Sequence, residues 1–419
     1  MSAPQYVSTR GGDAVSFREA LLRGLAPDGG LYVPTHVPDL PARWRQASSL
    51  GEVGQRVLAP WLEEEVEGVD DLVADALSFP IPLVELSGAW AGVFVLELFH
   101  GPTLSFKDVG ARTMARLMGA LLDGEPVTIL AATSGDTGSA VASGFAGISG
   151  VRVVLLYPKG QVSAVQERQL IVERENVRTL AVEGTFDDCQ RLVKAAFAEG
   201  IDGVRLSSAN SINIGRLLPQ MLYYVWAAVQ GIEGATVCVP SGNLGNLTAG
   251  TLAHRAGLPL AGFLAAHNAN DGFVRFLDGG DPPGGDSVRT ISNAMDVGVP
   301  SNLERLRALY TDDALRSLVR GKAIADEETT AAMQRVYEAT GYVADPHTAV
   351  GLEAVRRQRG AGDRYVVLAT AHPAKFPEAV EAATGITPGA PDRLARLWDA
   401  PTRVETIPPT LAALRQQIG

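Results

Sequence analysis

The chain is short of the features that would place it in several common protein classes. Its 419 residues include only two cysteines, Cys189 and Cys238, without a CxxC pair, so we expect a reducing cytoplasm and no disulfide framework. No apolar run approaches the roughly 18 residues that cross a bilayer, and residues 1–17 lack the apolar core of a signal peptide. The net charge of −11 comes without a basic cluster, which argues against nucleic acid or a membrane surface as a partner.

Signatures of nucleotide-binding and scaffold proteins are missing as well. Neither the P-loop pattern GxxxxGKS/T nor the dinucleotide pattern GxGxxG occurs, so a nucleotide-binding protein is a weak alternative. The chain has no internal repeat, heptad array or low-complexity tract, so a scaffold role finds no support.

The chain does contain short apolar runs that alternate with longer amphipathic stretches. A hydrophobic content of 46% with 20% charged residues is typical of a soluble globular protein, and the length suggests two or three domains. Residues 278–287 read as a loop, and residues 302–342 as largely helical. The apolar runs are residues 93–99, 127–131, 151–157, 177–182, 235–239, 261–266 and 365–370. Such runs, separated by helices, indicate mostly parallel sheets covered on both faces and hence an α/β layered fold.

One lysine stands at a Gly-Pro turn directly before an amphipathic helix. Residues 100–108 read HGPTLSFKD, and a helix predicted over 109–122 places Met114, Leu117, Met118 and Leu121 on one face. A lysine at the head of a buried helix loses solvation, so its pKa falls and its amine becomes a nucleophile and a base. The alternative, a solvated or ion-paired Lys107, is the usual state of a lysine.

Two polar loops follow predicted strands, at the position where α/β sheets bind ligands. In residues 240–248 (PSGNLGNLT), glycines let successive N–H groups and a helix N-terminus face one anion, which suits a single phosphate. Residues 132–138 (ATSGDTG) combine hydroxyls with N–H groups at a helix start, which suits a carboxylate. The alternatives are a tight strand–helix turn in the first loop and a helix cap by Asp136 in the second.

A third polar loop, residues 208–216 (SANSINIGR), concentrates hydrogen-bond donors without an opposing acid. It suits a second phosphate or a carboxylate, with Arg216 forming paired, charge-assisted hydrogen bonds. The alternative is a polar loop whose arginine caps a neighbouring element. Thr370, at the tip of the last predicted strand, would point into the same crevice, whereas His372 reads as structural.

Taken together, these motifs resemble the pyridoxal-phosphate enzymes of the tryptophan synthase β fold and, among them, the threonine synthase family of bacteria and fungi. The likeness runs over nearly the whole chain, from STRGG at 8–12 and GGLYVP at 29–34 to AHPAKF at 371–376. The combination of HGPTxxFKD with PSGNxG is the specific part, because single elements recur across the wider superfamily.

The resemblance implies an α/β fold of the tryptophan synthase β type (fold type II), with two open, twisted, mostly parallel sheets flanked by helices. We expect an N-terminal, mainly helical segment at 1–88 and a large cofactor-binding domain at 89–131 and 220–400. A smaller, mobile substrate domain would occupy 132–219, and a C-terminal helix 401–419.

The resemblance also implies roles for individual residues. Lys107 would be the catalytic residue and bond covalently to pyridoxal phosphate, and Thr370 would hydrogen-bond to its pyridine nitrogen. The cofactor phosphate would be held by Gly242, Asn243, Leu244, Gly245 and Asn246. The substrate carboxylate would be held by Thr133, Ser134, Asp136 and Thr137, and the substrate phosphate by Asn210, Ser211, Asn213 and Arg216. No metal site and no obligate protein partner are expected.

Two positions depart from the family pattern. Asp136 stands where related enzymes often have Asn. A carboxylate facing the phenolic oxygen of the cofactor would need a proton, so the group that contacts this oxygen stays open. Leu244 replaces the more usual Phe, and we expect little consequence because the backbone of this loop does the binding.

The implied activity converts O-phospho-L-homoserine and water into L-threonine and phosphate, the last step of threonine biosynthesis. One alternative is a threonine or serine dehydratase of the same superfamily, for which the donors of loop 208–216 would be surplus. A second is a non-catalytic protein that binds a phosphorylated metabolite, which would not need Lys107.

Overall fold

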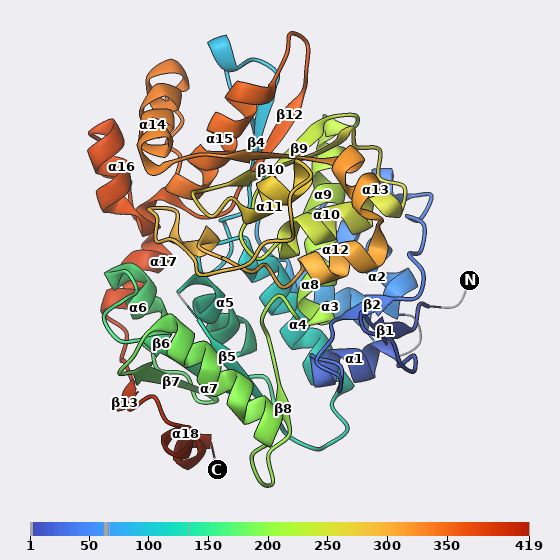
Figure 1. The fold of residues 1–419 in the computed structure, drawn as a ribbon, viewed down its shortest axis with the longest axis vertical. Helices are drawn as coiled ribbons and strands as arrows, with labels where there is room; N and C mark the ends of the chain where they lie inside the picture. Colours follow the sequence, from blue (N-terminus) through green and yellow to red (C-terminus); the bar gives the residue numbers. More distant parts are fainter. Residues whose placement is uncertain (1–2, 63–65, 67, 134, 419) are drawn as a thin grey trace.

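Two mostly parallel sheets organise the chain in the computed structural model, which describes residues 3–62, 66, 68–133 and 135–418 (Figure 1). The larger sheet has six strands in the order β11-β10-β9-β12-β4-β3. Its pairings are parallel except for that of β3 with β4. The strands are β3 (Leu83–Glu85), β4 (Val93–Glu97), β9 (Thr236–Pro240), β10 (Gly262–His267), β11 (Val319–Ala323) and β12 (Tyr365–Ala369).

The smaller sheet has five strands in the order β13-β7-β6-β5-β8, all paired in parallel. The strands are β5 (Val127–Ala132), β6 (Val151–Pro158), β7 (Val177–Val182), β8 (Leu206–Ser207) and β13 (Glu405–Ile407). All residues of β5 are buried, as expected of an inner strand covered on both faces.

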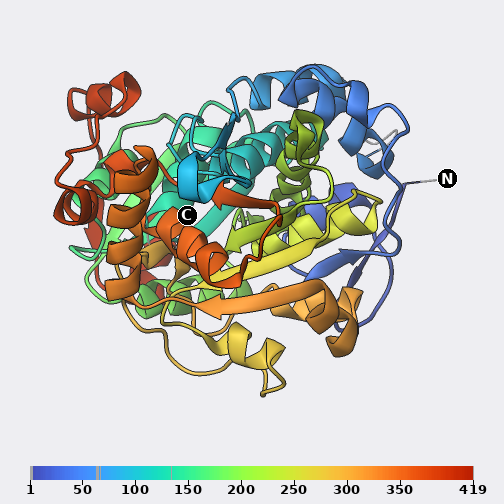
Figure 2. The ribbon, with the colours of Figure 1, turned by 90° about the horizontal axis from the view of Figure 1, so that it is seen from above.

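Helices lie on both sides of the larger sheet, as Figure 2 shows. Helices α14 (Asp326–Thr340), α15 (Pro346–Gln358) and α16 (Pro377–Thr384) pack together, and α15 contacts β9, β10 and β12. The other helices of this part are α4 (Lys107–Leu121), α8 (Ile214–Leu217), α9 (Met221–Ala227), α10 (Gly245–Arg255), α11 (Gly272–Leu277), α12 (Leu303–Leu309) and α13 (Asp312–Leu318).

The smaller sheet and the N-terminal segment carry the remaining helices. The helices around the smaller sheet are α5 (Asp136–Phe145), α6 (Ala164–Ile171), α7 (Phe186–Glu199), α17 (Asp392–Ala395) and α18 (Leu411–Ile418). The N-terminal segment consists of β1 (Tyr6–Ser8), α1 (Phe17–Arg23), β2 (Tyr32–Pro34), α2 (Leu50–Leu62) and α3 (Val69–Ala76), and β1 pairs antiparallel with β2.

Alternate residues of each strand pack into different hydrophobic cores. Ile129 belongs to the main core, which joins the N-terminal helices, α4 and the inner faces of both sheets. Its neighbour Leu130 points to the other face and packs with Leu192 of α7 and Leu414 of α18. A third core lies between the larger sheet and the α14–α16 layer. Both sheets are thus buried on both faces, which explains their continuous apolar runs.

The fold class expected from the sequence is confirmed, with differences at the weakest strands. All seven apolar runs form strands, and α4 begins at Lys107 rather than at Val109. Strand β11 lies inside the stretch expected to be helical. It pairs with β10 alone. Its sequence VRGKA contains Arg, Gly and Lys, so the strand does not form an apolar run that could be recognised in the sequence.

The sheet membership of two segments also differs from the expected domain boundaries. Strand β5, placed before the boundary at 131/132, belongs to the smaller sheet, because it pairs with β6 and β8. The segment 401–419, expected as a helix, adds β13 to the same sheet before α18 begins.

Candidate active site

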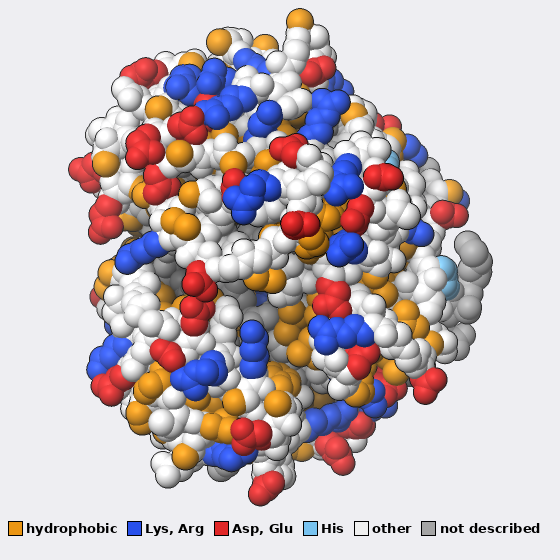
Figure 3. All heavy atoms as spheres, viewed as in Figure 1, with side chains coloured by type: hydrophobic (Ala, Val, Ile, Leu, Met, Phe, Trp, Pro, Cys, Tyr) orange, Lys and Arg blue, Asp and Glu red, His pale blue; other side chains and the backbone are white. Residues whose placement is uncertain are grey.

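The motifs around Lys107 and Thr370 meet where β12 ends. The Phe106 N–H donates to the Thr370 carbonyl at 2.9 Å, and the His372 N–H donates to the Leu104 carbonyl at 3.1 Å. These backbone bonds fix Lys107, the first residue of α4, beside the tip of β12. The carboxyl end of a parallel sheet is where α/β proteins bind ligands. Figure 3 shows the surface hollowed where the parts around the two sheets meet.

Lys107 has an amine suited to nucleophilic attack. Its side chain is partly buried, and burial is the main reason that its pKa falls to about 8. The Asp136 carboxylate opposes this shift, whereas the Lys375 and Arg216 cations add to it. At pH 7 about one molecule in ten would carry the neutral amine, against fewer than one in a thousand for an ordinary lysine. The lowered pKa agrees with the expectation from the sequence.

Left-handed backbone occurs in both loops around this lysine. Leu104 has a φ of 61° and Leu244 a φ of 59°, and these are the two non-glycine residues with positive φ in the described part of the chain. A leucine in this region is strained by roughly 1 kcal/mol or more and persists only where its surroundings fix it. Both leucines are buried, and such strain is typical of ligand-binding loops.

The loop from Gly242 to Asn246 has the donors that a cofactor phosphate needs. It opens α10, whose first turn directs backbone N–H groups outward. A Cβ atom on Gly242 would lie 2.9 Å from the Cα of Met295, so only glycine fits there. The Asn246 amide oxygen accepts 2.7 Å bonds from the hydroxyls of Tyr223 and Tyr224. Its Nδ2 is left buried without a partner among the described residues, which fits a bound anion.

Asn243 ties this loop to the loop at 208–216. Its Nδ2 donates to the Ser211 hydroxyl at 2.7 Å. Its backbone carbonyl accepts a 3.0 Å bond from the side chain of Asn302, next to α12. The fully buried Arg305 donates to the carbonyls of Ser211 and Tyr32, both at 2.9 Å. The start of α12 thus clamps the two loops together.

The cation of loop 208–216 has no carboxylate bonded to it within the described part of the chain. Arg216 is buried, and its Nη1 donates to the Ala209 carbonyl at 2.5 Å, but its Nε has no partner among the described residues. Burial lowers the pKa of Arg216 to about 10, against the effects of Asp108 and Tyr223, so the side chain stays charged at neutral pH. The Asn210 Oδ1 also has no partner among the described residues, but an amide oxygen accepts hydrogen bonds, so a phosphate would bond to the Nδ2 of Asn210. A buried cation without an ion pair fits an anionic ligand.

Asn213 corrects the expected set of phosphate ligands. Its Oδ1 accepts from the Gly215 N–H at 2.8 Å, and its Nδ2 donates to the carbonyls of Leu21 and Ser208 at 2.9 and 2.8 Å. The amide therefore caps α8 and joins it to α1, with no donor free for a substrate. An Asn at a helix N-cap gives the same sequence pattern as an Asn that binds phosphate.

The loop at 132–138 is built around the start of α5. The Thr133 hydroxyl accepts from the N–H groups of Gly135 and Gly138 at 3.0 and 2.8 Å and donates to the Gly135 carbonyl at 3.4 Å, so it braces the loop. Thr137 is partly exposed in the first turn, and Ser134 lies outside the described residues. The Asp136 carboxylate is ion-paired with Lys375 at 2.7 Å and does not cap the helix.

Several of these contacts were not predicted from the sequence. Asn302 and Arg305 carry no local signature of a site residue, and the tyrosines that hold Asn246 look like ordinary core residues. The one available signal was the position of Lys375 in the AHPAKF motif, which follows the strand that ends at the site.

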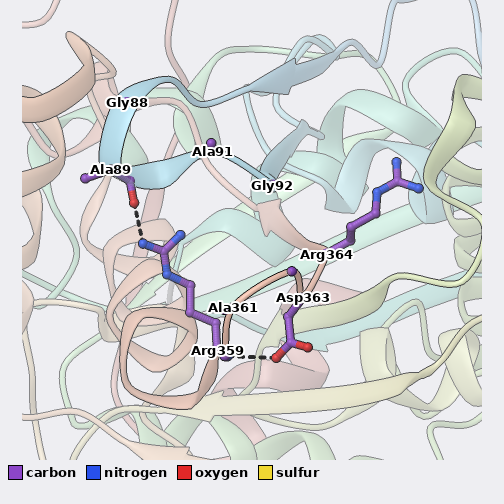
Figure 4. A pocket seen from close by; sticks show the side chains of 10 residues that line it. Gly88, Ala89, Ala91, Gly92, Arg359, Ala361, Asp363 and Arg364 are labelled. Carbon is purple, nitrogen blue, oxygen red and sulfur yellow. Dashed lines mark hydrogen bonds between the residues drawn. The ribbon is translucent and has the colours of Figure 1, made fainter.

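A surface pocket elsewhere on the larger sheet is separate from this site. Figure 4 shows it between η3 (Gly88–Trp90) and the connection from α15 to β12. Arg359 donates there to the Ala89 carbonyl, and the Gly360 N–H donates to Asp363 at 2.8 Å. The pocket lies before the first residue of β12, whereas Thr370 follows the last, so the strand separates them.

The described residues show neither a metal cluster nor a membrane span. They contain no group of three or more His, Cys, Asp or Glu side chains placed to hold a metal ion. None of the helices in this part of the chain combines the length and apolarity that crossing a membrane requires. Cys189 and Cys238 are both free and buried.

Comparisons with known proteins give the same picture. The family model described as pyridoxal-phosphate dependent enzyme matches residues 77–371. Models of the threonine synthase N terminus and C-terminal part match residues 5–76 and 348–418. The threonine synthase of Serratia marcescens is 42% identical over 417 residues, which cover 96% of each chain.

Solved structures agree over nearly the full length. A pyridoxal-phosphate-bound threonine synthase from Brucella melitensis has a TM-score of 0.92 at 37% identity and covers 99% of this chain and 98% of its own. The Escherichia coli threonine synthase has a TM-score of 0.90 at 39% identity and covers 99% of both chains.

The fold and the site define a pyridoxal-phosphate-dependent enzyme. The chain belongs to the threonine synthase family, and pyridoxal phosphate is its cofactor. The family and the cofactor predicted from the sequence are therefore confirmed.

Proposed function

We propose that this enzyme converts O-phospho-L-homoserine and water into L-threonine and phosphate. The observation that carries the proposal is the pair of donor-rich loops near Lys107. One is neutral and suits the cofactor phosphate, and the other holds the buried Arg216 without a bonded carboxylate. Two phosphates, one on the cofactor and one on the substrate, account for both loops. A dehydratase acting on threonine or serine would leave the second cation without a ligand.

In the overall reaction the bond between Cγ and the phosphate oxygen and one C–H bond at Cβ break. Water supplies the hydroxyl at Cβ, Cγ gains a hydrogen, and the remaining proton leaves with the phosphate. The cofactor, when bound, supplies an electron-withdrawing ring that delocalises the electron pair released at Cα. Lys107, once its amine is free, removes the proton at Cα and moves the proton at Cβ. Its pKa of about 8 suits both tasks, because efficient acid–base catalysts titrate near the working pH.

The other residues orient the substrate and the cofactor. Arg216 and Asn210 hold the substrate phosphate and the phosphate that leaves. The first turn of α5, with Thr137, faces the substrate carboxylate. Asn246 and the N–H groups of α10 would hold the cofactor phosphate, and Thr370, at the tip of β12, would bond to its pyridine nitrogen.

We further propose that the part around the smaller sheet closes over the substrate. This movement would keep bulk water away from the reacting carbons until the hydroxyl is added. A cytoplasmic location is supported by the free thiols of both buried cysteines.

The direct test is to incubate the purified protein with pyridoxal phosphate and O-phospho-L-homoserine and to identify the products. Equal amounts of threonine and phosphate are expected. Formation of 2-oxobutyrate from threonine, without phosphate release from phosphohomoserine, would establish a dehydratase instead. A protein that binds the phosphorylated compound without turning it over would be the non-catalytic alternative.

A further inference from the structure

Lys375 is a fully buried lysine that contacts both sides of the active site. It lies in η7 (Pro373–Lys375), in the connection that follows β12 of the larger sheet. Its Nζ forms a 2.7 Å ion pair with Oδ1 of Asp136, the first residue of α5 beside the smaller sheet. It also donates to the carbonyl of Thr103 at 3.1 Å, in the loop that leads to Lys107. A buried lysine is rare unless it is paired, and here the pair joins the two halves of the site.

Helix α6 holds the same carboxylate from the other side. The Gln166 amide donates to Asp136 Oδ1 at 3.1 Å. Gly135 has a φ of 133°, which favours glycine, and a Cβ atom there would come within 2.5 Å of the Gln166 amide carbon and displace this side chain. Gln169 of the same helix donates to the Thr103 carbonyl at 3.1 Å, beside the Lys375 ammonium. The Asp136 carboxylate is therefore fixed in position by an ammonium and an amide.

Four charged groups share this environment with Lys107. Asp136 on α5, Lys375 on η7 and Arg216 on α8 act on the Lys107 amine, and Asp108 acts on Lys375 and Arg216. Burial alone would raise the pKa of Asp136, but Lys375 and Lys107 together hold it well below its usual range. Asp136 is therefore ionised next to the reactive amine and has a second cation as its partner.

We propose that Lys375 is a positioning residue that acts on Lys107 through Asp136. Its ammonium fixes the Asp136 carboxylate and cancels its charge, so Lys107 faces a neutral ion pair instead of a bare carboxylate. The pair then resembles, in net charge, the neutral Asn that related enzymes often carry at the Asp136 position. This proposal rests on the proposed function only in taking Lys107 as the reactive amine.

The test measures the titration of Lys107 in the cofactor-free, full-length protein. Samples are labelled with a trace of acetic anhydride between pH 6 and pH 11, and the extent of modification at Lys107 is read by peptide mass spectrometry. Lys375→Met leaves the Asp136 carboxylate uncompensated and removes a neighbouring cation, so the Lys107 pKa should rise by about one unit. The neutral fraction at pH 7 would then fall about tenfold.

Opposite and compensating changes make the test specific. Asp136→Asn leaves the Lys375 charge unopposed, so the Lys107 pKa should fall by about one unit, and the double variant should return to within about half a unit of the parent. Lys159→Met, which removes a lysine that is 54% exposed, is the matched control and should change nothing. Loss of the fold alone would not produce shifts of opposite sign.

Two results would overturn the proposal. One is an unchanged Lys107 titration in Lys375→Met, and the other is a shift of the same sign in both single variants. If Lys375→Met does not fold, the fall in Asp136→Asn and its reversal in the double variant decide the question, and absence of either refutes it. A failure of the product assay would leave these titrations untouched, so the two proposals can fail separately.

Discussion

The cofactor loop at 242–246 and the substrate loop at 208–216 both supply donors to the site near Lys107, but they are built differently. The first is neutral and uses a left-handed Leu244, a helix N-terminus and the Asn246 amide held by two tyrosines. The second depends on the charge of Arg216. A cofactor that stays bound through many turnovers can be held by fixed backbone geometry. A phosphate that must arrive and leave in each cycle needs a strong attraction from one side chain.

The largest effect is expected from removing the residue that both loops serve. Lys107→Ala should lower kcat by at least about 10³-fold, because the covalent attachment and the moving base are both lost. The visible absorption of the cofactor-loaded enzyme should vanish, while the far-ultraviolet circular dichroism spectrum stays unchanged. Retained turnover in this variant would remove Lys107 from the mechanism.

A change in the substrate loop should act on the substrate alone. Arg216→Ala removes a buried charge from an ion contact, a loss worth about 2–4 kcal/mol, so kcat/KM for O-phospho-L-homoserine should fall about 30- to 1000-fold. Most of this fall should be in KM, and the affinity for pyridoxal phosphate should stay constant. Arg205→Ala is the control, because Arg205 precedes the loop and pairs with Asp123 at the surface. An unaltered KM in Arg216→Ala would show that the phosphate binds elsewhere.

A change in the cofactor loop should have the opposite selectivity. Asn246→Ala deletes the free amide donor and the side-chain oxygen that accepts from Tyr223 and Tyr224. The two hydroxyls keep only their longer bonds, to Gln220 at 3.2 Å and to the backbone carbonyl of residue 246 at 3.0 Å. The Kd for pyridoxal phosphate, measured by absorbance titration, should rise about tenfold or more. The free energy of unfolding of the cofactor-free protein should fall by about 1–3 kcal/mol in urea denaturation. If KM rose while the Kd for the cofactor held, the assignment of the two loops would be reversed.

The smallest effect is expected in the pH dependence of the rate at which Lys107 attaches to the cofactor. The neutral amine attacks the cofactor, and the Lys107 pKa lies at about 8. The rate at which the visible absorption band forms after mixing should therefore rise about tenfold per pH unit below 8 and level off above it. A rate that keeps rising to pH 10 would mean that Lys107 titrates like a solvated lysine.

The inner strands and the loop motifs could be predicted from the sequence, because their information is local. A strand buried on both faces, such as β5 or β10, is apolar at most of its positions, and a tight strand–helix turn needs its glycines. Edge strands escape this rule. Strands β11 and β13 each pair on one side only, so polar residues are tolerated in both.

The parts of the site that could not be predicted depend on contacts between distant segments. Arg305 lies 94 positions from Ser211, and Lys375 is 239 positions after Asp136, and no local pattern links either pair. The phosphate-binding role predicted for Asn213 was wrong for a different reason, because here a local pattern was present but had two meanings. Its residue type and place in the loop suited phosphate binding, but an N-cap has the same sequence signature, and only the positions of Leu21 and Ser208 decide between them.

The late position of β13 in the chain delays completion of the smaller sheet during synthesis. Strand β13 pairs with β7, yet it leaves the ribosome about 220 residues later, because β7 ends at Val182 and β13 starts at Glu405. At roughly 5–20 residues per second, the edge of β7 would wait about ten to forty-five seconds for its partner. Until then an unpaired strand edge is open to wrong partners, so the nascent chain should be most prone to aggregation in this interval.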